Sequence, residues 1–307
     1  MADYQKIIEH HPAVQQYMRK DMWVHRGEVV TYRPNVECEA FSTDAAGYRH
    51  SVFAGKRMSV ADCIQAGRYG LVLGASNLYG FGLDGNERTL PSLLAGHFGF
   101  PFGNVCLPEA NSRNLFSILQ GVAARVSAAP AVAVLLTGTD FSNFCYTGIA
   151  DAVFGSPNLK QRKEALEERG GRPSPERGFQ LLLSFSALWT TAAANLCRRH
   201  GIPLIIGKAA TFFDRSEPSE IERECKLGEA TSPGQEQFFE TYQRFIADFR
   251  SRRDDLAEQL GVPTAGPGPG TEVGFIDEFH YDAEGTKSIC GDFAAAIEAA
   301  LAKAPAD

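Results

Sequence analysis

The stretch Tyr69-Gly70-Leu71-Val72-Leu73-Gly74-Ala75-Ser76-Asn77-Leu78-Tyr79-Gly80 decides how this 307-residue chain folds. Its apolar run, residues 71–73, predicts a short buried strand that Gly74 ends. Ser76 follows on a tight turn, ahead of a helix expected at residues 89–98. A strand, a sharp turn with a serine and a helix hold a hydroxyl at the carboxyl edge of a sheet, where open α/β sheets bind ligands. The stretch also fits an ordinary strand–helix loop, in which glycine and serine are common.

A second motif lies near the end of the chain, at Phe275-Ile276-Asp277-Glu278-Phe279-His280-Tyr281. An aspartate three residues before a histidine can orient the imidazole and stabilise its charged form, while the other ring nitrogen faces a serine. A lone histidine is more often structural or exposed. Here a serine turn and an Asp-x-x-His pair occur in one chain.

Together the two motifs resemble those of the SGNH, or GDSL-like, hydrolases. The first block of that family, Gly-Asp-Ser-x-x-x-Gly, is matched by residues 74–80, with Ala75 in place of the acid. The last block, Asp-x-x-His followed by a glycine and a helix, is matched by residues 277–285. The resemblance covers residues 70–302. It implies an α/β fold, a three-layer α/β/α sandwich of the flavodoxin-like kind with a central parallel sheet.

The resemblance also implies catalytic roles. Ser76 is expected to be the nucleophile, His280 its general base and Asp277 the acid that holds the imidazole tautomer. The family's middle blocks, which supply oxyanion-hole donors, are matched less well. Ala110 takes the place of a glycine in the second block, so the backbone N–H groups of Ser76 and Ala110 are expected to face the oxyanion. The third block, Gly-x-Asn-Asp, carries Asp140 where an asparagine is expected.

Asp140 conflicts with an oxyanion-hole role, because an ionised carboxylate would repel the oxyanion. Three solutions are open. Asp140 is protonated in an apolar pocket, or Asn143 or Asn111 supplies the donor, or the enzyme is weak or specialised. Asp140 is equally well explained as the N-cap of the helix that follows it.

Composition and charge narrow the class of function. The formal net charge of −7 argues against a nucleic-acid partner, because phosphate binding needs a basic face. No stretch has the roughly twenty apolar residues of a membrane span, and residues 1–20 contain no secretion signal. Seven widely spaced cysteines without a Cys-x-x-Cys pair argue against disulfides and zinc and suit a reducing cytosol. We therefore expect a cytoplasmic protein without a membrane partner, cofactor or metal.

The chain divides into two expected parts. Residues 1–66 are expected to be an N-terminal extension, a helix and short strands packed on the core, and residues 67–307 the catalytic domain. An exposed insertion is expected at about 154–177, as a lid or as a plain surface excursion. The segment from Asp44 to Arg49 is similar to an element of carbohydrate-directed SGNH proteins. Arg49 and His50 either border a ligand or form a solvated hairpin edge.

Apolar periodicity predicts the other elements. The aromatic stripe of residues 238–249 is expected to be core, and residues 261–270 a loop. The expected helices are 7–22, 114–126, 179–200, 235–260 and 285–303, and the expected strands are 27–36, 69–73, 104–107, 131–137 and 203–207.

Three functions remain open at this stage. The first is a serine-dependent hydrolase acting on an acyl ester or N-acyl group of a small molecule or glycan. The second is an O-acyltransferase that uses the same triad to pass the acyl group to a sugar or metabolite hydroxyl. The third is a catalytically silent binding protein with the SGNH fold. A dinucleotide site is disfavoured because no glycine follows Gly74 at the second position after the strand, and a P-loop is disfavoured because Gly-Lys-Ser/Thr is missing.

Overall fold

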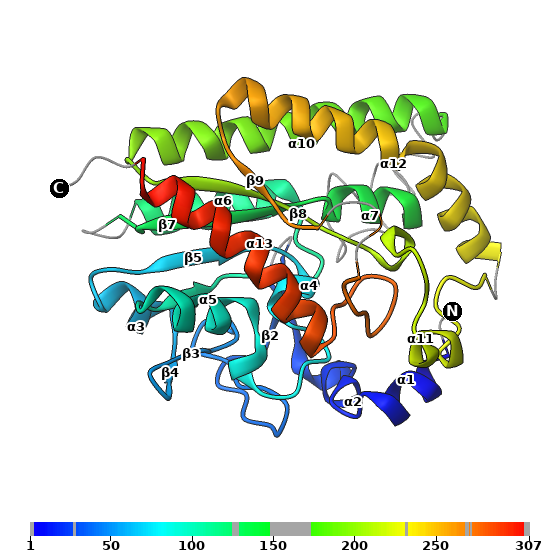
Figure 1. The fold of residues 1–307 in the computed structure, drawn as a ribbon, viewed down its shortest axis with the longest axis horizontal. Coiled ribbons are helices and arrows are strands. Elements are labelled where there is room, and N and C mark those ends of the chain that lie inside the picture. The colour runs from blue at the N-terminus through cyan, green and yellow to red at the C-terminus, as the bar shows by residue number, and fades with distance from the viewer. Residues whose placement is uncertain are drawn as a thin grey trace.

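A five-stranded parallel sheet forms the centre of the computed structural model, which describes residues 3–26, 29–124, 129–147, 173–230, 233–267, 270 and 272–303 (Figure 1). Its strand order is β6-β5-β7-β8-β9, and neighbouring strands are parallel. Counted along the chain, this is the 2-1-3-4-5 order of flavodoxin-like folds. The strands are β5 (Gly70–Leu73), β6 (Phe102–Asn104), β7 (Val132–Thr137), β8 (Leu204–Lys208) and β9 (Thr264–Ala265).

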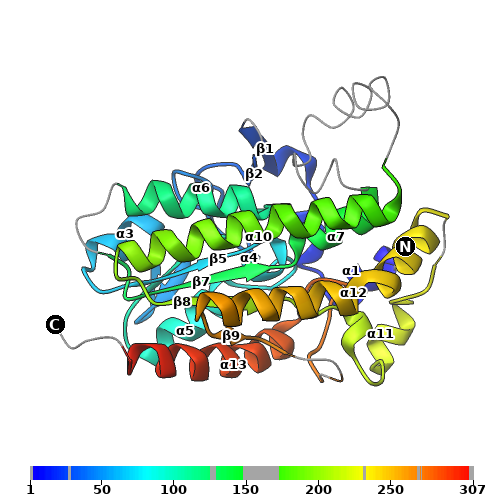
Figure 2. The same ribbon diagram turned by 90° about the horizontal axis from the view of Figure 1, so that it is seen from above.

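Side chains of the sheet alternate between two cores, which makes the fold three-layered. On β5, Val72 belongs to the core under α5 and α13, whereas Leu71 and Leu73 belong to the core under α3, α6 and α10. Figure 2 shows α6 on one side of the sheet and α13 on the other. The expected α/β/α fold is confirmed. The covering helices are α3 (Val60–Gln65), α5 (Leu90–Phe98), α6 (Ser112–Ala123), α10 (Pro175–Arg199) and α13 (Ala283–Leu301).

An aromatic cluster fills the space between α10, α7 (Thr139–Thr147) and α12 (Pro233–Leu260). Phe238, Tyr242 and Phe249 of α12 are buried in it, so the stripe expected to be core is confirmed as core. Phe141 of α7 stacks on Phe249 with 4.8 Å between ring centroids. This packing holds the first turn of α7 at the carboxyl end of the sheet.

The N-terminal residues form smaller elements than expected. The single helix expected at residues 7–22 is wrong, because Pro12 lacks an N–H and interrupts the helical hydrogen bonds. Of the strand expected at 27–36, residues 29–32 form β2, which pairs antiparallel with β1, and residues 27 and 28 lie outside the described part of the chain. A domain boundary after residue 66 stays a prediction. The elements are α1 (Tyr4–His10), α2 (Val14–Tyr17), η1 (Lys20–Met22), β1 (Trp23–Arg26), β2 (Val29–Tyr32), β3 (Ser51–Phe53) and β4 (Lys56–Met58).

Arg49 is buried, with 1% of its surface exposed, so both its expected places, at a solvated hairpin edge and beside a ligand, are wrong. Its guanidinium donates to Gly80 O at 2.6 Å, to Gly85 O at 2.8 Å and to Asn86 Oδ1 at 3.0 Å. It also donates to the Tyr17 hydroxyl. Neutral acceptors therefore satisfy this cation, and they join the N-terminal residues to the loop that follows Ser76.

Several expected elements have shifted ends. α6 begins at Ser112 because Asn111 caps it, and α10 begins at Pro175 because Ser174 caps it. The insertion expected at about 154–177 therefore overlaps α10 at residues 175–177, and its residues 154–172 lie outside the described part of the chain. Strand β9 lies inside the expected loop 261–270. The remaining short helices are α4 (Ser76–Tyr79), η2 (Asn86–Arg88), η4 (Phe212–Asp214) and α11 (Glu220–Glu224).

Candidate active site

Ser76 lies on a sharp turn at the carboxyl end of β5. Ala75 is extended, and Ser76 is the first residue of the one-turn helix α4, which Gly80 ends with a φ of 87°. A Cβ atom at Gly74 would lie 3.1 Å from Leu78 Cβ, so glycine allows this turn to pack closely. The turn sits between β5 and β7, where the strand order reverses and flavodoxin-like sheets bind ligands.

His280 lies between Ser76 and Asp277. Its Nε2 is 2.8 Å from Ser76 Oγ, and its Nδ1 is 2.7 Å from Asp277 Oδ2. Because an ionised carboxylate only accepts hydrogen bonds, Nδ1 carries the proton of the neutral ring, and Nε2 is left to accept the serine hydroxyl. The structure therefore brings the three predicted catalytic side chains into one hydrogen-bonded chain.

Asp277 is buried, with 2% of its surface exposed, yet its pKa is lowered. Burial alone would raise the pKa, but the charge and hydrogen bond of His280 and two backbone N–H groups outweigh it. These N–H groups belong to Phe279 and His280, and each donates to Oδ1 at 2.9 Å. The carboxylate is thus held as an anion in the place where it can stabilise an imidazolium.

Two residues, Phe81 and Tyr281, hold His280 and its loop in place. The ring of Phe81 packs on His280 with 4.3 Å between centroids, and Phe81 N–H donates to Ser76 O at 3.1 Å. Tyr281 anchors the histidine loop to the segment that follows β8, because its hydroxyl accepts the N–H of Ala210 at 2.9 Å. Serine and histidine are therefore positioned partly by the same residue, Phe81.

A pocket of about 420 Å³ opens beside this chain of residues. Of the expected oxyanion-hole residues, Ser76 and Asn143 line it, whereas Ala110, Asn111 and Asp140 are not among its lining residues. The lining residues are Tyr4, Ala75, Ser76, Asn77, Glu109, Gly138, Thr139, Ser142, Asn143, Ala209, Ala210, Thr211, Asp277, Glu278, Phe279 and His280.

Ala110, expected to donate its N–H to the oxyanion, is not among the residues that line the pocket. Ala110 is buried, and its N–H donates to Leu107 O at 3.3 Å. Glu109, the residue before it, lines the pocket and has a φ of 55°, in the left-handed region. Asn111 caps α6, because its Oδ1 accepts Asn114 N–H at 3.0 Å. The sequence could not have indicated that Glu109, and not Ala110, lines the pocket. The left-handed conformation at Glu109 is usually marked by a glycine, and this position has none.

Asp140 joins α7 to α6. It is 1% exposed, and it accepts the N–H of Ser112 at 2.8 Å as well as the Ser112 hydroxyl. Its expected role as N-cap is wrong, because α7 already begins at Thr139. The carboxylate caps the first turn of α6 instead. Burial raises its pKa to about 6, although hydrogen bonds from Ser112 and Ser186 lower it in part.

Glu278 and Tyr4 line the pocket, and neither carries a functional signal in the sequence. Glu278 lies inside the Asp-x-x-His motif, and its Oε1 is buried without a hydrogen-bond partner among the described residues. Tyr4 comes from α1, far from the motifs along the chain, so the N-terminal residues contribute to the pocket wall.

Other features of the described residues bear on cofactors and membranes. They contain no group of three or more His, Cys, Asp or Glu side chains that could hold a metal ion. None of their helices is long and apolar enough to cross a membrane.

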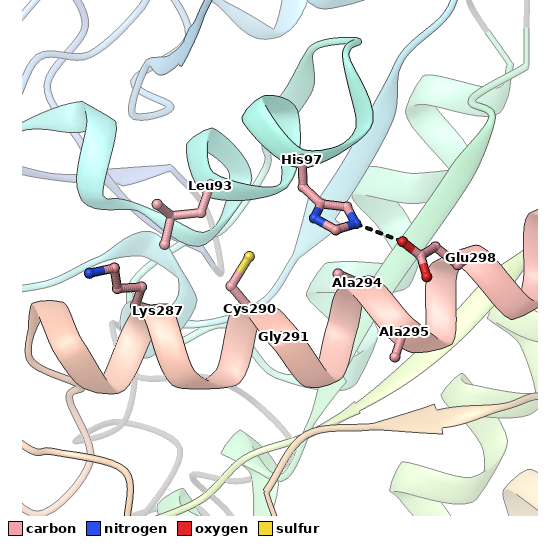
Figure 3. Close-up of a pocket in the computed structure, with 8 residues that line it drawn as sticks. All are labelled: Leu93, His97, Lys287, Cys290, Gly291, Ala294, Ala295 and Glu298. Atoms are coloured by element: carbon pink, nitrogen blue, oxygen red, sulfur yellow. Dashed lines mark hydrogen bonds and ion pairs between the residues drawn. The ribbon is translucent and has the colours of Figure 1, made fainter.

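A second hollow, of about 350 Å³, lies between α5 and α13, where His97 Nε2 is 2.7 Å from Glu298 (Figure 3). Cys290 lines it, and burial raises the pKa of that thiol to about 11, so it is a poor nucleophile.

Comparison with known proteins gives matches among solved structures. No protein-family model and no curated protein matches this chain. A carbohydrate acetylesterase from Sinorhizobium meliloti aligns with 76% of this chain and 99% of its own, at 13% identity and a TM-score of 0.48. A structure described as a carbohydrate acetylesterase family member, from the same organism, covers 76% and 99% at 16% identity and a TM-score of 0.44. A GDSL-like lipase from Bacteroides thetaiotaomicron covers 77% and 90% at 14% identity and a TM-score of 0.42.

Several of the matched structures carry the family name that the motifs at Ser76 and His280 resemble, GDSL. Likeness of overall fold does not transfer chemistry from one protein to another. What this chain does is therefore argued below from its own pocket.

Proposed function

We propose that this chain is a serine-dependent hydrolase that cleaves an acyl ester or N-acyl group of a small molecule or glycan. The observation that carries the proposal is the hydrogen-bonded chain from Ser76 Oγ through His280 to Asp277, at 2.8 Å and 2.7 Å. Hydroxyl, imidazole and carboxylate in this order catalyse acyl transfer on several unrelated folds.

In the proposed mechanism, Ser76 Oγ attacks the acyl carbonyl while His280 Nε2 takes the hydroxyl proton. Asp277 remains ionised and stabilises the imidazolium that forms. His280 then gives the proton to the leaving alcohol or amine, and an acyl-serine remains. Water, deprotonated by the same imidazole, attacks the acyl-serine and frees Ser76.

The oxyanion of the tetrahedral intermediate needs hydrogen-bond donors beside the nucleophile. We assign this role to the backbone N–H of Ser76 and, in place of Ala110, to that of Glu109, which lines the same pocket. Asn143, which also lines it, is the proposed side-chain donor. Losing one such donor costs about 2.7–4 kcal/mol of barrier, so Asn143→Ala should lower kcat by about 10²–10³-fold.

An acyltransferase would use the same three residues and replace water by a sugar or metabolite hydroxyl. The two functions differ in one measurement, the turnover of p-nitrophenyl acetate with and without an added polyol. Steady release of p-nitrophenol and acetate in water alone supports the hydrolase. Turnover that requires the polyol supports the transferase.

Labelling of the serine tests the proposal directly. A fluorophosphonate should add one adduct to the wild-type protein, detected by intact-protein mass spectrometry. Ser76→Ala and His280→Ala should remove the adduct. Ser142→Ala is the matched control, because Ser142 lines the same pocket and should leave labelling unchanged. Equal labelling of Ser76→Ala would contradict the proposal, and no labelling of folded wild type would support the silent binding protein.

We also propose a reducing compartment, the cytoplasm, for this chain. All seven cysteines are unpaired, and Cys63, Cys106, Cys145, Cys197 and Cys225 are buried. Free thiols persist where glutathione and thioredoxin keep them reduced. The only binding partner that the proposed reaction requires is its substrate, a small-molecule or glycan acyl ester.

A further inference from the structure

The ring of Phe81 covers one face of the His280 imidazole. The two ring centroids are 4.3 Å apart, and the rings are tilted by 31°. Rings this close and this nearly parallel overlap face to face, because edge-to-edge contact would hold their centroids further apart. Phe81 is 8% exposed and is not among the residues that line the pocket. Any effect of Phe81 on the reaction therefore passes through His280 and not through the substrate.

Tyr17 of α2 holds the same ring from the N-terminal part of the chain. The ring centroids of Tyr17 and Phe81 are 5.2 Å apart. Tyr17 is fully buried, and its hydroxyl donates to Leu83 O at 2.7 Å, two residues beyond Phe81. Arg49 donates to this hydroxyl and also to the carbonyl oxygen of Gly80, the residue before Phe81. Hydrogen bonds therefore fix the loop on both sides of Phe81, and Tyr17 packs on the ring itself.

Gly82 shows how tightly this loop packs between α2 and the histidine motif. It has a φ of 80°, and a Cβ atom there would lie 2.7 Å from Ile276 Cδ1 and 3.1 Å from Val14 Cγ2. Val14 is the first residue of α2, and Ile276 directly precedes Asp277. The loop that carries Phe81 therefore has little freedom to move away from His280.

The charge of the imidazole changes during the proposed reaction. His280 is neutral before Ser76 attacks and becomes an imidazolium when it takes the hydroxyl proton. The face of an aromatic ring attracts a cation within about 6 Å of its centroid, and attracts a neutral group less. The contact with Phe81 is thus stronger in the transition state than in the ground state, which is the condition for raising kcat. Asp277 acts on the same cation through Nδ1, at the edge of the imidazole.

We propose that Phe81 is a positioning residue, which holds the His280 imidazole against the face of its ring and stabilises the imidazolium that forms as Ser76 attacks. Tyr17 fixes Phe81 for this role. The inference rests on the proposed hydrolase function and adds to it two residues that the catalytic motifs do not include. It also gives the N-terminal residues a part in the reaction.

Fluorinated phenylalanines at position 81 test the electrostatic contribution, because fluorine weakens the attraction of a ring for a cation and alters its shape little. With p-nitrophenyl acetate, kcat should fall with each added fluorine atom, by about tenfold for Phe81→pentafluorophenylalanine. KM should change by less than about twofold, since the interaction is made in the transition state. The fluorinated rings keep the core filled, so this test does not depend on a variant with a cavity.

Leucine variants test the ring as a whole. Phe81→Leu removes the aromatic face and should lower kcat by about tenfold or more. Phe102→Leu is the matched control, because Phe102 is buried in the same apolar core and packs on Phe98 and Phe100. It should leave kcat within about twofold of wild type. Active sites are counted with a fluorophosphonate, so that kcat refers to folded protein only.

A double-mutant cycle tests the role of Tyr17. Tyr17→Leu removes the ring that packs on Phe81 and should lower kcat by about threefold. In the double variant with Phe81→Leu, the loss should be no larger than in Phe81→Leu alone, because Tyr17 acts through Phe81. Independent, additive losses would exclude Tyr17 from the inference.

Two results would overturn the role of Phe81. One is an unchanged kcat throughout the fluorinated series, and the other is an equal loss of kcat in Phe81→Leu and Phe102→Leu. Failure of the proposed function looks different. In that case wild type itself does not hydrolyse the ester, and Ser76 gives no fluorophosphonate adduct.

Discussion

Two buried aspartates, Asp140 and Asp277, lie in different regions of the molecule and respond to burial in opposite ways. Asp140 joins α6 to α7 and is 1% exposed; Asp277 lies in the histidine loop and is 2% exposed. Each accepts hydrogen bonds from a backbone N–H group. Yet the pKa of Asp140 is raised to about 6, whereas that of Asp277 is lowered.

The difference lies in the partners and not in the depth of burial. Ser112 and Ser186 offer Asp140 neutral donors, which offset only part of the desolvation. Beside Asp277, the charge that His280 carries when protonated, its hydrogen bond and two backbone N–H groups together outweigh the desolvation. The carboxylate that faces a cation therefore stays ionised far below neutral pH, whereas the one with neutral donors takes up a proton near pH 6. Asp140 serves as a helix cap, and Asp277 as the partner of an imidazolium.

The largest expected effect follows from removing the charge at Asp277. Asp277→Asn should lower kcat for p-nitrophenyl acetate by about 10⁴-fold, because an amide neither holds the His280 tautomer nor stabilises the imidazolium. Asp140→Asn is the matched control at a carboxylate of equal burial. It should change kcat by less than about tenfold, since the pocket is not lined by Asp140. Similar losses in both variants would contradict the division of roles.

A second prediction extends the comparison to a buried cation. Arg49, like Asp140, has neutral partners only, but a guanidinium does not give up its proton inside a protein. Arg49→Met would leave buried carbonyl groups of Gly80 and Gly85 without a donor. We expect the free energy of unfolding in urea to fall by about 3 kcal/mol or more. Arg57→Met, at an exposed arginine, should cost less than about 1 kcal/mol.

These comparisons show what the sequence could and could not predict. The three residues of the hydrogen-bonded series could be predicted because each belongs to a short local pattern. Ser76 follows a strand on a tight turn, and Asp277 and His280 form an i, i+3 pair. Strands β5 and β7 were readable because central parallel strands are continuous apolar runs. Such signals depend on neighbours in the sequence.

The parts that were missed depend on contacts between distant residues. Strand β9 is two residues long and exists only because β8 offers it an edge. The sequence around Arg49 predicts a surface residue, because its burial depends on hydrogen bonds to the carbonyl groups of Gly80 and Gly85, which lie far along the chain. Asp140 matched a catalytic motif, but α6 brings Ser112 to it from an earlier part of the chain. None of these pairings leaves a periodic or local trace in the sequence.

A third prediction uses the opposite pKa shifts. Because the folded pKa of Asp140, about 6, exceeds the ordinary aspartate value of 3.8, the folded state holds the proton more tightly than the unfolded chain does. Its contribution to stability is therefore full below pH 3.8 and is lost as the pH rises to about 6, on the order of 3 kcal/mol. Asp140→Asn should lack this loss. The free energy of unfolding of wild type in urea should exceed that of Asp140→Asn by more at pH 4 than at pH 7.

Asp277 should behave in the reverse sense. Its folded pKa lies below 3.8, so its contribution is present above that pH and is lost as the pH falls through the folded pKa. The advantage of wild type over Asp277→Asn should therefore be larger at pH 7 than at pH 3. The same sign of pH dependence for both variants would show that burial, and not the partner, governs these carboxyl groups.

The smallest expected effect comes from one donor to Asp140. Ser112→Ala removes the hydroxyl but leaves the backbone N–H that also binds the carboxylate, at 2.8 Å. Because the lost hydrogen bond stabilises the ionised form, the pKa of Asp140 should rise further above about 6. Stability should fall by about 1 kcal/mol at pH 8, where the carboxylate is charged, and by less at pH 4. Ser117→Ala, at an exposed serine of the same helix, controls for helix propensity. An equal loss at both pH values would mean that Ser112 contributes to packing and not to holding the charge of Asp140.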